Sequence, residues 1–306
     1  MAILKLKPAL KEAIWGGTNL KTKFNIKTDL ETVAEAWVLS AHKDGESTIL
    51  GGEYDGLTLT AALKEIGPST LGSRGEDFAY FPLLIKLIDA RDKLSVQVHP
   101  DDEFALENEG EYGKTEMWYI VDCDEGAELY FGFKKDVSKE EFSQRIKDNT
   151  LTEVLNNVPV KKGDVFFIPS GTVHAIGAGI VIAEIQQNSN TTYRIFDYGR
   201  VGDDGKQRPL HIEKASMVSN LSKQTAAKQQ EGNVLADCDY FKVRHLKVEN
   251  GAEIFVDDKS FSVLLCIEGK VSVEGITLSK GECVFIPANS GSVIINGSAE
   301  IIESRV

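Results

Sequence analysis

The chain has 306 residues, enough for one large domain or two of ordinary size. Its composition is globular, with 42% hydrophobic and 26% charged residues, and its formal net charge is -13. This acidic balance argues against nucleic acid or an anionic membrane as a partner, because both need a basic surface, but it permits an anionic small molecule where a few Lys and Arg converge.

The N-terminal segment and the cysteines favour a cytoplasmic protein. MAILKLKPALKEAIWGG has no long apolar core and no small-residue cleavage site, and no run approaches the roughly 18 apolar residues of a membrane span. The four cysteines are dispersed without CxxC spacing. We therefore expect buried free thiols in a reducing cytosol rather than disulfides or a zinc knuckle.

Strand-like segments dominate the chain. They are short, rich in β-branched and aromatic residues, and bounded by Gly, Pro, Asp and Asn. Examples, in chain order, are 34–41, 81–90, 93–99, 116–123, 127–133, 164–170 and 179–188. Helical periodicity is confined to 59–67, 101–110 and 139–157, the last with an expected break at Asn149. The pattern predicts a mainly β fold, a sandwich or barrel, with small helical insertions.

The segment LSVQVHPDD (94–102) alternates apolar and polar side chains. Because successive side chains of a strand point to opposite faces, Ser95, Gln97 and His99 share one face. Either that face meets solvent or it lines a site. A proline ends the strand, and one of the two aspartates after it is expected to cap a helix.

Two distant segments of the chain are similar to each other. VKKGDVFFIPSGTVHAI (160–176) and LSKGECVFIPANSGSVI (278–294) share a Lys-Gly-acidic-x-x-Phe-Ile-Pro frame, and chance likeness between two strand–proline turns is the alternative. The polar segment 222–233 between them is the best linker candidate. We therefore predict two related β units, a larger one spanning 1–230 and a short C-terminal one spanning 231–306.

The first of these segments spaces Gly163, Pro169, Gly171 and His174 as G-x5-P-x-G-x2-H. This spacing resembles the second motif of the cupin superfamily, in which the glycines and the proline turn one strand into the next and the histidine points into the barrel. The resemblance implies tandem cupin units, which are jelly-roll β-barrels. In the second segment Ser292 replaces the histidine, so we expect the C-terminal unit to be a degenerate cupin without a metal.

Gln97, His99 and Glu116 occupy the place of the first cupin motif in chain order, and His174 completes a set of four. Two imidazoles, a carboxylate and an amide form a mixed N/O site that suits Zn²⁺ and, less selectively, Mn²⁺, Fe²⁺ or Ni²⁺. No thiolate joins the set, which favours an open catalytic site over a closed structural one. Each residue alone has an ordinary alternative, since a lone strand histidine is usually hydrogen-bonded in place and a lone glutamate often lies at the surface.

Four motifs in order, LSVQVHPDD, KTEMWYI, IPSGTVHAIG and TTYRIFDYGR, together resemble the type I mannose-6-phosphate isomerases in their short bacterial form. The resemblance runs from IWGG (14–17) through RPLHIEKA (208–215). The C-terminal unit resembles the family only in its general β-rich character. It implies a single zinc ion. The implied ligands are Gln97, His99, Glu116 and His174.

The same resemblance implies roles for further residues. Arg194 matches the catalytic arginine of the family, Lys114 matches an active-site lysine, and Glu184 matches an acidic residue proposed to take part in proton transfer. Lys86 and Ser95 match positions that contact the phosphate. For Arg194 and Lys86 the alternative is a surface charge or a structural ion pair, although Lys86 interrupts the apolar run FPLLIKLI and would be costly to bury unpaired.

The implied reaction interconverts mannose 6-phosphate and fructose 6-phosphate. Zn²⁺ at the O1/O2 edge of the open sugar would act as a Lewis acid and stabilise an ene-diolate. Glu184 is the first candidate for the base, because desolvation can raise the pKa of a carboxylate toward the working range. Lys114 and Arg194 would stabilise developing oxyanion charge. Which group moves the proton and which only polarises the substrate stays open.

Three alternatives remain open at this stage. A cupin isomerase or epimerase could act on another sugar phosphate, such as glucose 6-phosphate. A non-catalytic sugar-binding cupin predicts a broken ligand set, and a metal-dependent dioxygenase is disfavoured by the Lys86/Ser95 pair and the Lys114–Glu116 spacing. The sequence does not decide the native metal, the breadth of substrates, the direction of flux, or whether the protein is a monomer or a homodimer.

Overall fold

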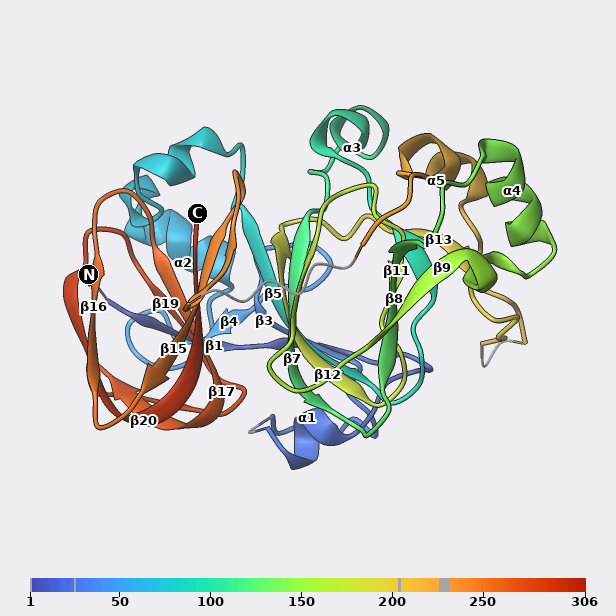
Figure 1. The fold of residues 1–306 in the computed structure, drawn as a ribbon. Coiled ribbons are helices and arrows are strands. Elements are labelled where there is room, and N and C mark those ends of the chain that lie inside the picture. Colours follow the sequence, from blue (N-terminus) through green and yellow to red (C-terminus); the bar gives the residue numbers. More distant parts are fainter. Residues whose placement is uncertain (1, 25, 203–204, 226–231) are drawn as a thin grey trace.

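The computed structural model describes residues 2–24, 26–202, 205–225 and 232–306, and strands dominate it (Figure 1). The described strands form three sheets in which every pairing is antiparallel. The predicted linker 222–233 and the boundary at 230/231 fall partly on 226–231, outside the described residues. The mainly β fold with small helical insertions is confirmed.

Two of the sheets face each other and enclose the first barrel. One has six strands, in the spatial order β10 (Val165–Ile168), β7 (Glu116–Cys123), β12 (Ile180–Gln187), β5 (Leu83–Ala90), β3 (Glu35–Leu39) and β2 (Ala9–Lys11). The other has five strands, in the order β13 (Tyr193–Phe196), β6 (Val96–Val98), β11 (His174–Ala175), β8 (Glu128–Phe133) and β9 (Leu155–Pro159).

Strand alternation divides the six-stranded sheet between two cores. On β7, Trp118 and Ile120 pack with Leu129 and Phe131 of the five-stranded sheet, inside the barrel. The intervening side chains of β7, such as Tyr119, belong to a second core that extends into the C-terminal unit. Because side chains of a strand alternate between faces, every second residue of β5, β7 and β12 therefore points into the barrel.

The third sheet forms the C-terminal unit. In spatial order its main path is β14 (Val234–Asp237), β15 (Lys242–Val248), β20 (Gly291–Arg305), β17 (Ser262–Val273), β19 (Cys283–Ile286), β1 (Leu4–Lys7) and β4 (Thr48–Ile49). Two further strands, β16 (Ala252–Val256) and β18 (Ile276–Ser279), pair with β20 and β17. Strands β1 and β4 thus join the N-terminus of the chain to the C-terminal sheet, and the division at 230/231 stays a prediction.

The two similar segments share positive φ at two matching turn positions, and each contains a four-residue strand, β10 or β19. Gly163 and Gly281 both have positive φ, at 90° and 86°. Gly171 and Asn289 also match, with φ of 81° and 60°, and Asn is among the few L-residues that enter this region readily. Ser292, which stands where the first unit has its histidine, is exposed. The internal repeat is therefore structural as well as sequential.

The helices lie at the periphery of the sheets. They are α1 (Asn19–Thr22), α2 (Leu59–Ile66), α3 (Asp102–Asn108), α4 (Lys139–Lys147) and α5 (Ile212–Val218), with the 3₁₀ turns η1 (Pro68–Thr70), η2 (Ser73–Asp77) and η3 (Leu151–Val154). As predicted, Asn149 interrupts the third helical segment, with φ of 57°. Asp101 caps α3, since its carboxylate accepts a hydrogen bond of 2.9 Å from the backbone N–H of Phe104.

Helices α4 and α5 cover the outer face of the five-stranded sheet (Figure 1). Phe142 and Ile146 of α4 and Ala215 of α5 are buried in one cluster with Val96 and Val98 of β6. Because the apolar side of β6 is buried in this way, its polar side must face the barrel interior.

The described helices are all too short or too polar to cross a bilayer. The four cysteines are free thiols, as expected. Cys266 and Cys283 are buried, whereas Cys123 and Cys238 are only half-buried.

Candidate metal centre and active site

A row of residues across the six-stranded sheet points into the barrel. Lys86 of β5 lies directly opposite Glu184 of β12, and Glu184 lies directly opposite Trp118 of β7. Paired residues in antiparallel strands share a face, so these side chains meet inside the barrel. Glu116, two residues before Trp118, shares that face and is fully buried.

A second row crosses the five-stranded sheet from the opposite wall. Gln97 of β6 pairs with Arg194 of β13 on one side and with His174 of β11 on the other. Ser95 and His99 flank Gln97 on the same face, and both are buried. The polar face of LSVQVH therefore lines the inside of the barrel rather than meeting solvent.

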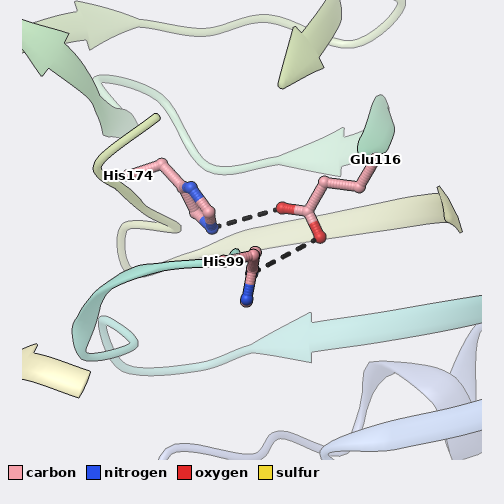
Figure 2. Close-up of side chains that lie close together, drawn as sticks. All are labelled: His99, Glu116 and His174. Atoms are coloured by element: carbon pink, nitrogen blue, oxygen red, sulfur yellow. Dashed lines mark ion pairs between the residues drawn. The ribbon is translucent and has the colours of Figure 1, made fainter. Parts of the chain in front are cut away.

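His99, Glu116 and His174 converge where the two walls meet (Figure 2). One ligand atom from each lies within 4.8 Å of the other two. Nε2 of His174 is 3.2 Å from Oε1 of Glu116, and Nε2 of His99 is 3.7 Å from Oε2. Buried N/O donors from β7, from β11 and from the residue that follows β6 thus face one small volume.

Backbone carbonyls orient both imidazoles. Nδ1 of His99 lies 2.9 Å from the carbonyl oxygen of Thr191, and Nδ1 of His174 lies 2.9 Å from that of Thr172. A carbonyl can only accept, so each Nδ1 carries the hydrogen and each Nε2 presents a lone pair. Burial lowers the pKa of His174 to about 4 and that of His99 well below its usual value, so both rings are neutral at pH 7.

These donors fit a divalent cation. Nε2 of His99 and Oε1 of Glu116 are buried without a hydrogen-bond partner among the described residues. Buried polar atoms in native proteins are normally satisfied, so this pair calls for a partner that accepts lone pairs. Neutral imidazole nitrogens held by carbonyls, together with a carboxylate, are the donors that structural and catalytic metals use.

Gln97 borders the same volume. Its side-chain amide nitrogen lies 3.4 Å from Nε2 of His174. Amide oxygen and nitrogen have nearly the same shape, so a half-turn of the amide would present the oxygen to the centre instead. Gln97 as a metal ligand stays a prediction.

Lysines and carboxylates alternate beside the metal centre. Nζ of Lys114 lies 3.1 Å from Glu116 and 3.6 Å from Glu184, and Nζ of Lys86 lies 3.3 Å from Glu184 and 3.5 Å from Glu35. Glu35 in turn accepts a hydrogen bond of 2.7 Å from the indole N–H of Trp37. The chain of ion pairs therefore connects the metal centre to β3, and each lysine has a buried, charged partner.

The pKa expected for Glu184 is wrong in direction. Burial alone would raise its pKa, but Lys114 and Lys86 outweigh burial and hold the pKa well below its ordinary value. The indole N–H of Trp118 also donates a 2.9 Å hydrogen bond to Glu184. Glu116 shows the opposite balance: burial and the charge of Glu184 raise its pKa, and Lys114 and Lys86 do not outweigh them.

A cavity of about 310 Å³ opens onto this arrangement. Its polar lining includes Glu35, Lys86, Ser95, Gln97, Lys114, Glu184, Asn190, Thr192, Arg194 and Arg208. All the site residues expected from the sequence therefore either line this cavity or, for His99, Glu116 and His174, form the cluster that adjoins it through Gln97 and Lys114.

Arg194 lies on the cavity wall next to Ser95. Its Nε donates a hydrogen bond of 3.3 Å to the Ser95 hydroxyl, and Nη1 donates one of 3.2 Å to the carbonyl of Pro209. Burial and the positive charges of Arg208 and Arg200 lower the pKa of Arg194. The surface-charge alternative does not describe Arg194, which is half-buried in a cluster of cations.

Several residues of the site had no role in the sequence analysis. Glu35, Trp118 and Arg208 contact or line the cavity, and the carbonyls of Thr172 and Thr191 orient the imidazoles. Glu35 lies in a strand that the sequence does predict, and its alternation with buried alanines was the available signal. Backbone carbonyls carry no side-chain signal at all.

The fold and the site together define a metal-binding cupin enzyme. A family model described as "Phosphomannose isomerase type I, catalytic domain" matches residues 3–126, and one described as "Mannose-6-phosphate isomerase, cupin domain" matches residues 230–306. The chain therefore belongs to the type I mannose-6-phosphate isomerase family, and it is an isomerase. The non-catalytic and dioxygenase alternatives are thereby set aside.

Relatives and solved structures agree with this family over nearly the whole chain. GmuF of Bacillus subtilis is 40% identical, covering 99% of this chain and 98% of the relative. The mannose-6-phosphate isomerase of Streptococcus mutans is 39% identical with the same coverage. The crystal structure of the mannose 6-phosphate isomerase from Bacillus subtilis superposes with a TM-score of 0.89 at 36% identity, covering 100% of both chains.

Proposed function

We propose that this protein interconverts mannose 6-phosphate and fructose 6-phosphate. The observation that carries the proposal is the His99–Glu116–His174 cluster beside a cavity lined by two lysines and two arginines. An anionic substrate suits a cationic cavity even on an acidic protein. Relatives of nearly full-length similarity bear the name mannose-6-phosphate isomerase, which supports the same substrate pair.

We propose Zn²⁺ as the metal, one ion per chain. His99, Glu116 and His174 would hold it, with Gln97 as a fourth ligand, and a mixed N/O set without thiolate is typical of catalytic zinc. When bound, Zn²⁺ supplies Lewis acidity to the carbonyl end of the open-chain sugar. The carbonyls of Thr191 and Thr172 would keep the imidazole lone pairs aimed at it.

The charged groups of the cavity would carry out the proton transfer. Glu184 borders the cavity, and its lowered pKa keeps it ionised and able to accept a proton at Oε1, although it also limits its basicity. The proton would move between C1 and C2 on one face of the sugar, through an ene-diol. Lys114 and Arg194 would stabilise the oxyanion charge that develops.

The phosphate would bind on the Arg194 side of the cavity. Ser95 is the proposed hydroxyl contact, and it already interacts with Arg194. Lys86 is the second proposed phosphate contact, and its present partners are Glu184 and Glu35. A substrate phosphate would have to compete with these carboxylates for Lys86.

We further propose that 1–230 is the catalytic unit and that 231–306 is a degenerate cupin unit with a structural role. The C-terminal barrel is filled by apolar side chains such as Leu264, Val284 and Ile301. Its counterpart of His174 is the exposed Ser292. An apolar interior leaves no donors for a metal.

The direct test is conversion of mannose 6-phosphate to fructose 6-phosphate by the purified protein, with glucose 6-phosphate as the competing substrate. Zinc content is measured in parallel, before and after a chelator. We expect turnover that is lost with the metal and recovered on adding zinc. Full activity in metal-free protein would contradict the zinc role, and faster turnover of glucose 6-phosphate would contradict the substrate.

A further inference from the structure

Two guanidinium groups, those of Arg200 and Arg208, bond one carboxylate beside the cavity, and that of Arg194 lies near them. Asp197 is buried, and its Oδ1 accepts hydrogen bonds from Nη2 of Arg200 at 2.5 Å and from Nη2 of Arg208 at 2.6 Å. Its Oδ2 accepts a bond of 2.8 Å from Nε of Arg208. Asp197 therefore holds the Arg208 guanidinium by two parallel bonds, which fixes its plane.

The positive charge of this cluster is not balanced. Arg194 lies close enough for Arg208 and Arg200 to affect its titration, and the hydrogen bonds of its side chain go to neutral acceptors, Ser95 and the Pro209 carbonyl. Asp197, together with Asp92, whose Oδ2 lies 3.9 Å from Nη1 of Arg200, offsets two of the three arginines and leaves one positive charge in surplus. Arg194 and Arg208 both line the cavity, so the surplus charge faces the space where the substrate would lie.

The pairing of β13, β6 and β11 gives the approximate distance between this cluster and the metal centre. Arg194, Gln97 and His174 lie side by side on three neighbouring strands. Neighbouring strands lie about 4.8 Å apart, so two strand spacings, roughly 10 Å, separate the Arg194 strand from the His174 strand. In an extended hexose 6-phosphate the whole carbon chain separates the carbonyl end from the phosphate. The length of this substrate is therefore of the same order as the distance between the two strands.

We propose that Arg208 binds the phosphate group of the substrate, together with Ser95, and thereby determines the preference for phosphorylated sugars. This inference rests on the proposed function and names the side chain that recognises the phosphate end of that substrate. Asp197 bonds Nε and Nη2 of Arg208, so the guanidinium is already fixed and its remaining N–H groups are free to bind an anion. Binding therefore costs little side-chain entropy. Lys86, the other proposed phosphate contact, would reach the phosphate from the opposite wall, where it lies between two carboxylates.

Arg200 offers a matched control for Arg208. Both arginines donate to Oδ1 of Asp197, so Arg208→Ala and Arg200→Ala each remove one partner of the same buried carboxylate. The Arg200 guanidinium, however, bonds the Lys93 carbonyl and lies outside the cavity lining. A purely structural role of Arg208 therefore predicts the same result for both variants.

The experiment measures binding of mannitol 6-phosphate by calorimetry, and KM and kcat for mannose 6-phosphate, in the zinc-loaded protein. Mannitol 6-phosphate has no carbonyl and is not isomerised, so its Kd reports on binding separately from the chemical step. Loss of a charge-assisted contact predicts that Arg208→Ala raises Kd and KM by about 10- to 100-fold, while kcat changes much less. Arg208→Lys keeps the positive charge but loses the planar guanidinium, so its Kd and KM should lie between those of the native protein and those of Arg208→Ala.

Equal effects of Arg208→Ala and Arg200→Ala on Kd, or an unchanged Kd in Arg208→Ala, would overturn the inference. A loss in kcat with unchanged KM would also overturn it, because the contact would then belong to the chemical step. Failure of the proposed function looks different: the native protein would bind mannitol 6-phosphate through Arg208 but would not interconvert the two hexose phosphates.

Discussion

The carbonyl oxygen of Thr191 lies 2.9 Å from Nδ1 of His99, so a residue outside the strands orients a buried imidazole of the metal centre. The loop between β12 and β13 is held in place by Glu111. Oε2 of Glu111 accepts hydrogen bonds from the backbone N–H of Asn190 at 3.3 Å and from the Thr191 hydroxyl at 3.4 Å.

We expect Glu111→Ala to lower zinc affinity by about 10- to 100-fold, the range typical for groups that orient metal ligands. The reason is that the Thr191 carbonyl would no longer be held against His99. Titration of the metal-free protein with zinc in the presence of a competing chelator measures this. Lys43→Ala, which removes an exposed partner of Glu111 without touching the loop, is the control; equal affinities in both variants would refute the role of Glu111.

Replacement of a residue of the metal cluster should remove the bound metal. In His174→Ala and in Glu116→Gln we expect zinc content after dialysis to fall well below one ion per chain, because each change removes a donor from a buried set of three. The same variants should lose the thermal stabilisation by zinc, which amounts to about 2.7 kcal/mol when free zinc is at one hundred times Kd. His245→Ala changes a histidine of the C-terminal unit and should behave like the native protein; retention of zinc by His174→Ala would disprove the ligand set.

Lys114 should contribute strongly to the stability of the metal-free protein. Lys114→Met leaves Glu116 and Glu184 buried with one lysine fewer, and breaking a buried pair typically costs about 3–5 kcal/mol. Urea unfolding in the presence of a chelator measures the loss. Lys135→Met, which removes an exposed ion pair with Glu141, should stay within about 0.5 kcal/mol of the native protein. Similar losses in both variants would speak against a buried charge network.

Asp197 should give the protein an acid-sensitive component of stability. Burial opposes ionisation of this carboxyl, but hydrogen bonds from Arg208 and Arg200 hold its pKa below the ordinary 3.8. Because the pKa in the folded state is lowered, this stabilisation is present above pH 3.8 and is lost as the pH falls through the folded pKa. The difference in unfolding free energy between native protein and Asp197→Asn should therefore be largest near neutrality and shrink below pH 3.8, as urea titrations across this range can show. A difference in unfolding free energy that does not change with pH would contradict this role of Asp197.

Local patterns predicted several of the elements that carry the site, but not β11 or β13. The segment 116–123 coincides with β7, and the break at Asn149 and the cap at Asp101 follow from the preferences of these side chains alone. Alternation along 94–99 was enough to place Ser95, Gln97 and His99 on one face. These features depend on neighbours within a few residues, which is why the sequence reveals them.

The electrostatics of the site could not be predicted in this way. Glu184 has a lowered pKa because Lys86 reaches it from β5 and Lys114 from the segment just before β7, whereas burial alone implies the opposite shift. Arg208 shows no local pattern that connects it with Arg194 or Asp197. Whether a buried charge is favoured depends on which distant charges fold against it, and that is a tertiary property.

The amino-acid sequence by itself determined the strands, the polar face of β6 and the types of donor available, because these follow from chain periodicity and from side-chain chemistry. Only the tertiary structure decided that His99, Glu116 and His174 meet within one small volume, and that Asp197 holds Arg208 at the cavity. The physical reason is that strand pairing sets distances between residues far apart in the chain, and those distances decide coordination and charge.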